Sequence, residues 1–262
     1  MKPNKSQILS EEIAFFDKTI NESKVFDPFT EEGWLTLNQE FRTLCRPDSN
    51  DHLLDVGCGT GSSSRIYTPS EVKYTGIDLS PLSIQQAKIN YPNFSFLVGD
   101  ACRLPFENNT FTIVAFSSVL HHIPNYDSAL QEAFRVLKPG GKVFAYDPNA
   151  LNPAMALFRV PSSPFYLKAG VSPNEAPLIP KNLINSFKKN GLESVKQKCR
   201  SGIEYKHVAP KAINSLLKIY NALDKGIEFT GLGKWFGTFI ITVGTKPKKT
   251  IQKCSDVSSD WR

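Results

Sequence analysis

The stretch LLDVGCGTGSSS, from Leu53 to Ser64, constrains the fold of this chain more than any other stretch. Its first four residues read as a buried strand, and glycines follow at positions 57, 59 and 61. Glycine adopts positive φ readily and lets a ligand approach the main chain closely. The first amides of a following helix favour an anionic group. The stretch therefore predicts a strand, a ligand-binding turn and a helix, in that order.

Short apolar runs alternate with amphipathic segments from residue 51 to residue 147. This alternation is typical of parallel β-α-β units, so we expect a doubly wound, Rossmann-like α/β sheet. Strands are predicted over 52–57, 73–80, 94–101, 111–120 and 141–147, and helices over 62–67, 81–91 and 126–137. Ser80 and Pro81 are expected to cap and open the second of these helices. Residues 138–141 are expected to form a sharp turn after the third.

Two helices are predicted before this core, over 10–20 with Ser10 as the cap and over 31–44. Residues 148–180 contain seven prolines, which argue against a regular helix or a central strand there. A helix over 181–191, a strand over 192–198, a helix over 210–223 and a last strand over 237–246 follow. We expect a single domain over 1–246 and a disordered polar tail over 247–262.

Composition favours a soluble, cytoplasmic protein. Hydrophobic residues make up 40% and charged residues 21% of the chain, and the sequence contains neither a long apolar run nor a signal-peptide pattern. The five cysteines are scattered, without a C-x-x-C pair, which fits reduced thiols and argues against a metal site.

Charge is distributed unevenly along the chain. Residues 1–150 have 13 basic and 18 acidic side chains, a net charge of −5, whereas residues 151–262 have 18 and 7, a net charge of +11. A solvated basic face explains this as well as attraction of an anionic acceptor, an acidic membrane surface or nucleic acid. Peripheral contact with a membrane therefore stays open, although no transmembrane segment is expected.

Acidic residues follow the second and third predicted strands. Asp78 lies 21 residues beyond Gly57, where a carboxylate can accept hydrogen bonds from two ribose hydroxyls, and Asp100 can accept from an adenine amine. Ligands bind at the carboxyl ends of strands in such sheets. The spacing G-x-G-x-G, with Ser62 at the position of the third glycine, departs from the dinucleotide fingerprint G-x-G-x-x-G.

Residues 50–147 closely resemble class I S-adenosylmethionine-dependent methyltransferases. The resemblance rests on LLDVGCGTG, YTGIDLS, VGDACRLPFENNTFTIVAFSSVLHHIP and RVLKPGGKVFAYDPN. It implies a seven-stranded sheet whose last strand is antiparallel, and S-adenosylmethionine as the cofactor. It also implies cofactor-binding roles for Asp55, Gly57, Cys58, Gly59, Gly61, Asp78, Leu79, Asp100, Ala101 and Ser117. Within this set Asp55 would lie near the amino group of the methionine part, and Ser117 near the transferable methyl.

Methyl transfer from a sulfonium is a direct in-line displacement, which requires mainly proximity and alignment. His121 and His122 follow the fourth strand, and either could act as a general base toward an oxygen or nitrogen acceptor. A structural role in the loop is an equally good interpretation.

Acceptor sites in this family lie outside the core, here in residues 1–50, 148–180 and 202–234. Their aromatic content suggests a pocket for a small amphiphilic or anionic molecule, with Phe158, Phe165 and Tyr166 in its wall. An RNA methyltransferase that uses the basic C-terminal half, an NAD-dependent oxidoreductase and a methyltransferase-like partner without activity remain alternatives. No nucleic-acid module is visible, and the sequence does not indicate an oligomeric state.

Overall fold

The computed structural model describes the chain apart from residues 1–4, 24–26, 69–71, 169–170, 207–216 and 249–262. One seven-stranded sheet organises it, in the order β3-β2-β1-β4-β5-β7-β6. Its strands are β1 (His52–Val56), β2 (Lys73–Asp78), β3 (Ser95–Val98), β4 (Phe111–Ser117), β5 (Leu137–Pro148), β6 (Glu193–Arg200) and β7 (Phe239–Thr245). Only β7 runs antiparallel to its neighbours β5 and β6, which confirms the predicted fold.

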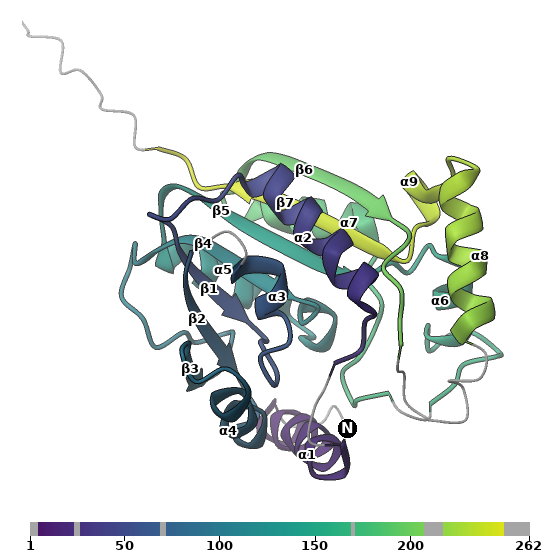
Figure 1. Cartoon of the computed structure of the whole chain (residues 1–262), viewed down its shortest axis with the longest axis horizontal. Coiled ribbons are helices and arrows are strands. Elements are labelled where there is room, and N and C mark those ends of the chain that lie inside the picture. Colours follow the sequence, from purple (N-terminus) through teal and green to yellow (C-terminus); the bar gives the residue numbers. More distant parts are fainter. Residues whose placement is uncertain (1–4, 24–26, 69–71, 169–170, 207–216, 249–262) are drawn as a thin grey trace, which may run out of the picture.

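Helices cover both faces of this sheet (Figure 1). On one face lie α2 (Glu31–Cys45), α3 (Ser64–Tyr67) and α4 (Pro81–Asn90), and on the other lie α5 (Tyr126–Val136) and α7 (Pro180–Lys189). The helix α1 (Lys5–Ser23) packs against α4, and α8 (Leu217–Phe229) and α9 (Gly233–Phe236) lie beyond β6 and β7. No helix among the described residues is long and apolar enough to cross a membrane.

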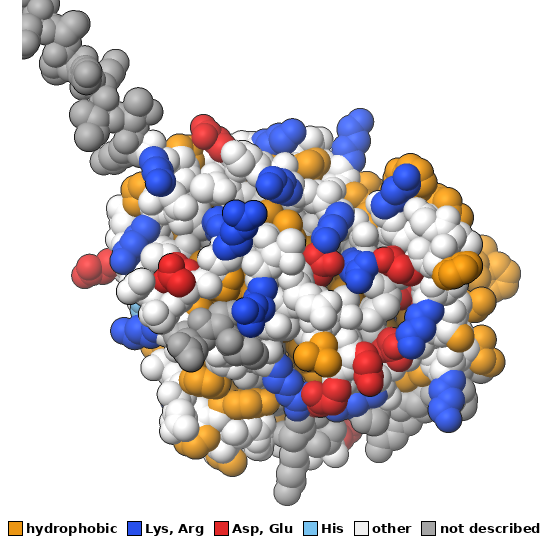
Figure 2. All heavy atoms as spheres, turned by 45° about the horizontal axis from the view of Figure 1, so that its top comes forward, with side chains coloured by type: hydrophobic (Ala, Val, Ile, Leu, Met, Phe, Trp, Pro, Cys, Tyr) orange, Lys and Arg blue, Asp and Glu red, His pale blue; other side chains and the backbone are white. Residues whose placement is uncertain are grey.

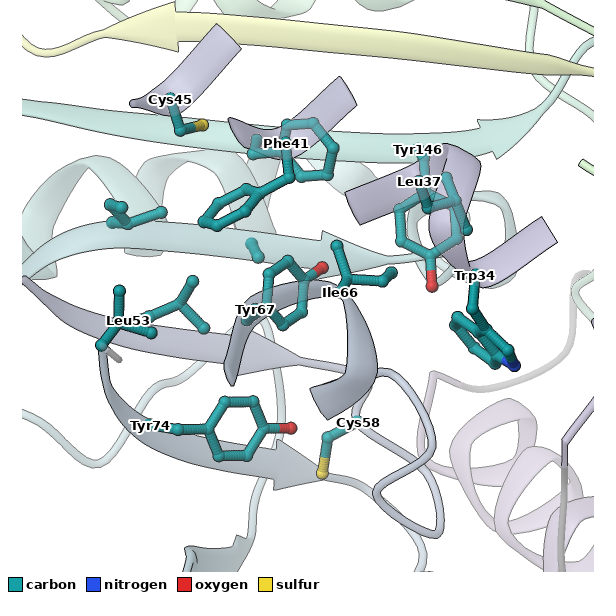
Figure 3. Packing of buried hydrophobic residues seen from close by; sticks show 14 of the residues in the cluster. Trp34, Leu37, Phe41, Cys45, Leu53, Cys58, Ile66, Tyr67, Tyr74 and Tyr146 are labelled. Atoms are coloured by element: carbon teal, nitrogen blue, oxygen red, sulfur yellow. The ribbon is translucent and has the colours of Figure 1, made fainter. Parts of the chain in front are cut away.

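Aromatic side chains fill the core beneath α2. Phe41 packs edge-on against Tyr67 and Phe144, with ring centroids 4.9 and 5.4 Å apart. Figure 3 shows how Trp34 and Tyr146 continue this cluster toward the carboxyl ends of the strands. A rigid layer of rings therefore supports the region in which ligands bind in such sheets.

Helix ends largely follow the sequence signals. The Ser80 hydroxyl accepts a hydrogen bond from the Ser83 amide at 3.0 Å, and Pro81 opens α4, as predicted. Helix α1 instead begins at Lys5, so Ser10 lies inside it and not at its cap. The cap pattern at Ser10 and the acidic residues after it therefore placed the start of this helix five residues too late.

Two further expectations need correction, and two others fall outside the described residues. Residues 148–180 contain a helix, α6 (Pro153–Phe158), because the Asn152 side chain caps it and proline is tolerated in a first turn. Residues 138–141 belong to β5, with a register irregularity opposite β4, and do not form a separate turn. The first half of the helix predicted over 210–223, and the tail from residue 249, lie outside the described residues.

Candidate active site

A cavity of about 780 Å³ opens at the carboxyl ends of the strands, beside the point between β1 and β4 where the strand order reverses. The turns after β1, β2, β3 and β4 form its floor, and α1 contributes Glu12, Phe15 and Phe16 to its wall. Its volume lies within the range of about 300–1,000 Å³ typical of ligand sites.

The three glycines after β1 serve different purposes. A Cβ at Gly57 would lie 2.5 Å from the Val119 side chain, and one at Gly61 would lie 2.6 Å from the Tyr91 ring. A Cβ at Gly59 would meet no atom within 4 Å, although Gly59 has a φ of +52° and lines the cavity. Gly59 is therefore the exposed part of the turn, whereas Gly61 is needed for packing and does not line the cavity.

Asp78 fixes this turn from the neighbouring strand. Its Oδ2 accepts a hydrogen bond from the Gly59 amide at 2.9 Å, and its Oδ1 accepts one from the Ser80 amide at 2.9 Å. Burial raises the pKa of Asp78, while these two amide bonds oppose the shift. Cys58, Leu79, Asp100 and Ala101 also line the cavity, as the sequence predicts.

Asp55 does not reach the cavity wall. It is fully buried, and its carboxylate accepts hydrogen bonds from the hydroxyls of Ser63 at 2.6 Å, Tyr74 at 2.7 Å and Ser117. Burial raises the pKa of Asp55 to about 6, against the effect of these bonds. Asp55 therefore holds Ser117 from beneath, and Ser117 lines the cavity.

His121 is paired with a buried carboxyl group. Its ring Nδ1 and its backbone amide both point at Asp147 Oδ1, at 2.9 and 3.1 Å. These two contacts tie His121, in the loop after β4, to Asp147 near the end of β5. Burial lowers the pKa of His121 to about 4 and raises the pKa of Asp147 to about 8. Asp147 Oδ2 has no hydrogen-bond partner among the described residues.

His122 contacts residues from α1 and from the proline-rich segment 148–180. Its Nδ1 lies 2.8 Å from Ser172 Oγ and 3.1 Å from Glu12 Oε1, and Glu12 also accepts a hydrogen bond from the Asn174 amide at 3.2 Å. Burial lowers the pKa of His122, and the nearby His121 lowers it further by a smaller amount. Helix α1 and the proline-rich segment are thereby tied together over the loop that follows β4.

Comparisons with known proteins agree with this geometry. The Methyltransferase domain family model matches residues 54–145. A sterol 4-C-methyltransferase of Caenorhabditis elegans is 31% identical over 123 residues, covering 45% of this chain and 37% of that protein. A demethylmenaquinone methyltransferase of Renibacterium salmoninarum is 33% identical over 117 residues, covering 45% and 48%.

The fold is shared more widely. A methyltransferase structure from Thermotoga maritima, described as S-adenosylmethionine-dependent, superposes with a TM-score of 0.60 at 18% identity, covering 90% of this chain and 99% of that one. Residues 54–145 therefore carry a methyltransferase domain of the class I S-adenosylmethionine-dependent type. The chain spans about half the length, or less, of the curated relatives it matches.

The far wall of the cavity is where the structure departs most from the sequence-based expectation. Phe158 lines the cavity, but Phe165 and Tyr166 do not, and Phe165 is 61% exposed. A turn directs Phe165 outward, because its amide bonds the Ser163 hydroxyl at 3.2 Å and the Tyr166 amide bonds the Ser163 carbonyl.

Several residues of the cavity wall carried no sequence signal of their own. Arg159 and Glu175 both line the cavity and form an ion pair at 2.5 Å. Glu12, in the first helix, contacts residues more than one hundred positions away, which no local pattern can predict. Aromatic content did indicate some of the wall, and the residues concerned are Phe15, Phe16, Trp34, Tyr205 and Tyr220.

Proposed function

We propose that this protein transfers a methyl group from S-adenosylmethionine to a small, largely apolar acceptor bound in the same cavity. The observation that carries the proposal is one continuous cavity, which is lined both by Gly59, Asp78 and Asp100 and by an apolar wall that contains His121 and His122. We propose a single domain over residues 1–246 as the unit that performs this reaction.

Gly59, Asp78 and Asp100 fit the cofactor. Asp78 and Asp100 line the cavity, and their carboxylates would hold the ribose hydroxyls and the adenine amine. Gly59 has open space where a side chain would stand, so it would pass close to the methionine part. When bound, the sulfonium supplies an activated methyl group, and the protein has mainly to align the acceptor with it.

His122 is the better candidate for the general base. A base that takes a proton from the acceptor becomes a cation, which a nearby carboxylate stabilises. His122 has Glu12 Oε1 at 3.1 Å, whereas the partner of His121 is Asp147, whose raised pKa of about 8 keeps it mostly neutral at physiological pH. We therefore assign His121 to positioning the loop and His122 to the proton transfer.

The charge of the cavity favours an uncharged acceptor over an anionic one. Its described lining includes four carboxyl side chains, those of Glu12, Asp78, Asp100 and Glu175, against one arginine, Arg159. Arg159 is already paired with Glu175. The names of the relatives support this class, since one acts on a sterol and another on demethylmenaquinone, both largely apolar ring compounds.

Part of the basic C-terminal half pairs with acidic residues of the N-terminal half, which weakens the argument for an RNA substrate. Lys198 and Arg200 on β6 pair with Glu40 of α2, and Lys206 lies 2.7 Å from Asp27. Figure 2 shows acidic and basic side chains interspersed on one face of the molecule. Charge pairing across the fold thus supports the small-molecule proposal.

A label-transfer assay tests the proposed function. The protein is incubated with tritium-labelled S-adenosylmethionine and an organic-solvent extract of cells that produce it, and radioactivity in the re-extracted organic phase is counted. We expect label in that phase with the wild-type protein and much less with Asp78→Ala. Thermal unfolding provides the control, because S-adenosylhomocysteine should raise the melting temperature and NADH should not. Protection by NADH alone would overturn the proposal.

A further inference from the structure

Exposed apolar side chains gather on one side of the molecule. Of the sixteen large hydrophobic side chains that are exposed among the described residues, eleven lie in residues 151–167 and 219–236. They are Leu151, Leu157, Phe158, Phe165, Leu167, Ile219, Leu223, Phe229, Leu232, Trp235 and Phe236, which we call the apolar face. Figure 2 shows hydrophobic side chains at the right-hand edge, where α8 lies in Figure 1. Such a concentration marks an interaction surface.

Helix α8 directs Leu217 and Tyr220 toward the cavity and two polar side chains toward neighbouring backbone. Asp224 is buried and accepts a hydrogen bond from the Gly202 amide at 2.7 Å, and Asn221 exchanges hydrogen bonds with the backbone of Tyr205. Leu223 and Phe229 point outward and are 66% and 94% exposed. Because the inner hydrogen bonds fix the rotation of the helix, its apolar side cannot turn into the core.

The apolar face adjoins the cavity. The Asn152 side chain at the start of α6 donates to the Phe236 carbonyl at 2.8 Å, so α6 and α9 are held together. The Leu167 amide donates to the Phe158 carbonyl at 3.0 Å and closes the loop between these two residues. Phe158 and Leu167 are both exposed and both line the cavity, so the cavity wall continues into the apolar face.

Basic side chains accompany the apolar ones. Lys168 and Lys218 are exposed beside the apolar face, and Lys234 lies 4.0 Å from the centre of the Trp235 ring. The two acidic side chains of α8 are engaged elsewhere, because Asp224 is buried and Glu228 pairs with Arg200. Exposed aromatic and aliphatic residues next to lysines suit the boundary between acyl chains and anionic headgroups.

We propose that the apolar face docks the protein on an anionic phospholipid bilayer, with the apolar face against the acyl chains and Lys168, Lys218 and Lys234 at the headgroups. Charge complementarity selects a lipid surface over a second copy of this chain, because two copies would bring these lysines together. The proposal rests on the proposed function in one respect only, namely that an apolar acceptor enters the cavity from the bilayer past Phe158 and Leu167.

Vesicle co-sedimentation tests this docking. The full-length protein is mixed with vesicles of equal parts phosphatidylcholine and phosphatidylglycerol, or of phosphatidylcholine alone. We expect binding to the anionic vesicles that weakens with added salt, and little binding to the neutral ones. Leu223→Glu should lower the partition coefficient about tenfold, because it removes apolar burial and adds a repelled charge. Ile89→Glu on α4 is the matched control, since Ile89 is also 66% exposed, and it should bind as the wild type does.

Three results would overturn docking on lipid. In the first, the wild-type protein stays in the supernatant. In the second, Ile89→Glu loses as much vesicle binding as Leu223→Glu does. In the third, light scattering finds a wild-type dimer that Leu223→Glu converts to a monomer.

Calorimetric titration with S-adenosylhomocysteine separates the two proposals. Leu223→Glu should bind it as tightly as the wild type does, and failure of the wild type to bind it would count against the proposed function while leaving the vesicle result intact.

Discussion

The Asp78 carboxylate accepts a hydrogen bond from the Gly59 amide, with 2.9 Å between Oδ2 and N. This bond joins the turn after β1 to the end of β2, two features that the sequence presents as separate signals. Gly59 faces the cavity with open space where a side chain would stand, and Asp78 lines the same cavity. The ligand-facing shape of the glycine turn therefore depends on the neighbouring strand.

The open space at Gly59 can be tested with a branched side chain. Gly59→Val should abolish binding of S-adenosylhomocysteine, because the added atoms would occupy the cavity where the ligand must approach. Gly231→Val is the matched control, since Gly231 also has a positive φ of 74° and a Cβ there would meet no atom within 4 Å, but Gly231 lies away from the cavity. Both variants should lose similar stability, and calorimetry should find intact affinity only in Gly231→Val. Equal loss in both would contradict a contact at Gly59.

The assignment of His122 as the base predicts a selective loss of turnover. His122→Gln should reduce the rate of label transfer by roughly a hundredfold, within the range for a lost general base, and leave cofactor affinity unchanged. Because burial lowers the pKa of His122, the wild-type rate should be flat above about pH 6.5, the ordinary histidine value. His52→Gln, at the opposite end of β1, should behave as the wild type does. Full turnover by His122→Gln across the pH range would refute the assignment.

Phe158 and Phe165 form a matched pair for the acceptor wall. Phe158→Ala should weaken acceptor affinity severalfold, because Phe158 lines the cavity, whereas Phe165→Ala should leave it unchanged, because Phe165 points to solvent. Cofactor affinity should be the same in both variants. The measurement is the apparent acceptor affinity in the label-transfer assay. A larger effect of Phe165→Ala than of Phe158→Ala would support the sequence-based expectation that Phe165 belongs to the acceptor wall.

Stability should fall as the pH rises from about 6.5 to 8. Folding raises the pKa of Asp147 from 3.8 to about 8, so the folded state binds more protons than the unfolded state in this window and is destabilised as they are lost. Below pH 6.5 His121 has the opposite effect on stability. Its pKa is lowered to about 4 in the folded state, so between pH 4 and 6.5 the unfolded state binds the proton more readily and stability falls as the pH falls. Asp147→Asn should remove a decline of about 2 kcal/mol between pH 6.5 and 8. Urea unfolding at several pH values measures it, and an unchanged slope in the variant would show that Asp147 does not titrate there.

Short-range sequence patterns predicted the strands of the sheet and several of the residues that line the candidate site. Strands β1, β2, β3 and β4 are short runs rich in apolar residues, and the residues that directly follow β1, β2 and β3 reach the cavity because parallel strands end at the same edge. The buried position of Asp55 could not be predicted from such local patterns. Its burial beneath the turn depends on hydroxyls from Ser63, Tyr74 and Ser117, which come together only in the folded sheet. The contact of Glu12 with Ser172 joins residues 160 positions apart, so the sequence could not reveal it.

Calorimetric titration of S-adenosylhomocysteine into the wild type and Asp78→Ala tests the central claim most directly. We predict a single site in the wild type and an affinity lower by roughly ten- to a hundredfold in the variant, as expected for a lost charged hydrogen-bond acceptor of about 1.5–3 kcal/mol. Part of the loss would come from the freed Gly59 amide, so unfolding of the variant is measured alongside. An unchanged affinity in a folded Asp78→Ala protein would contradict the assignment of this cofactor site.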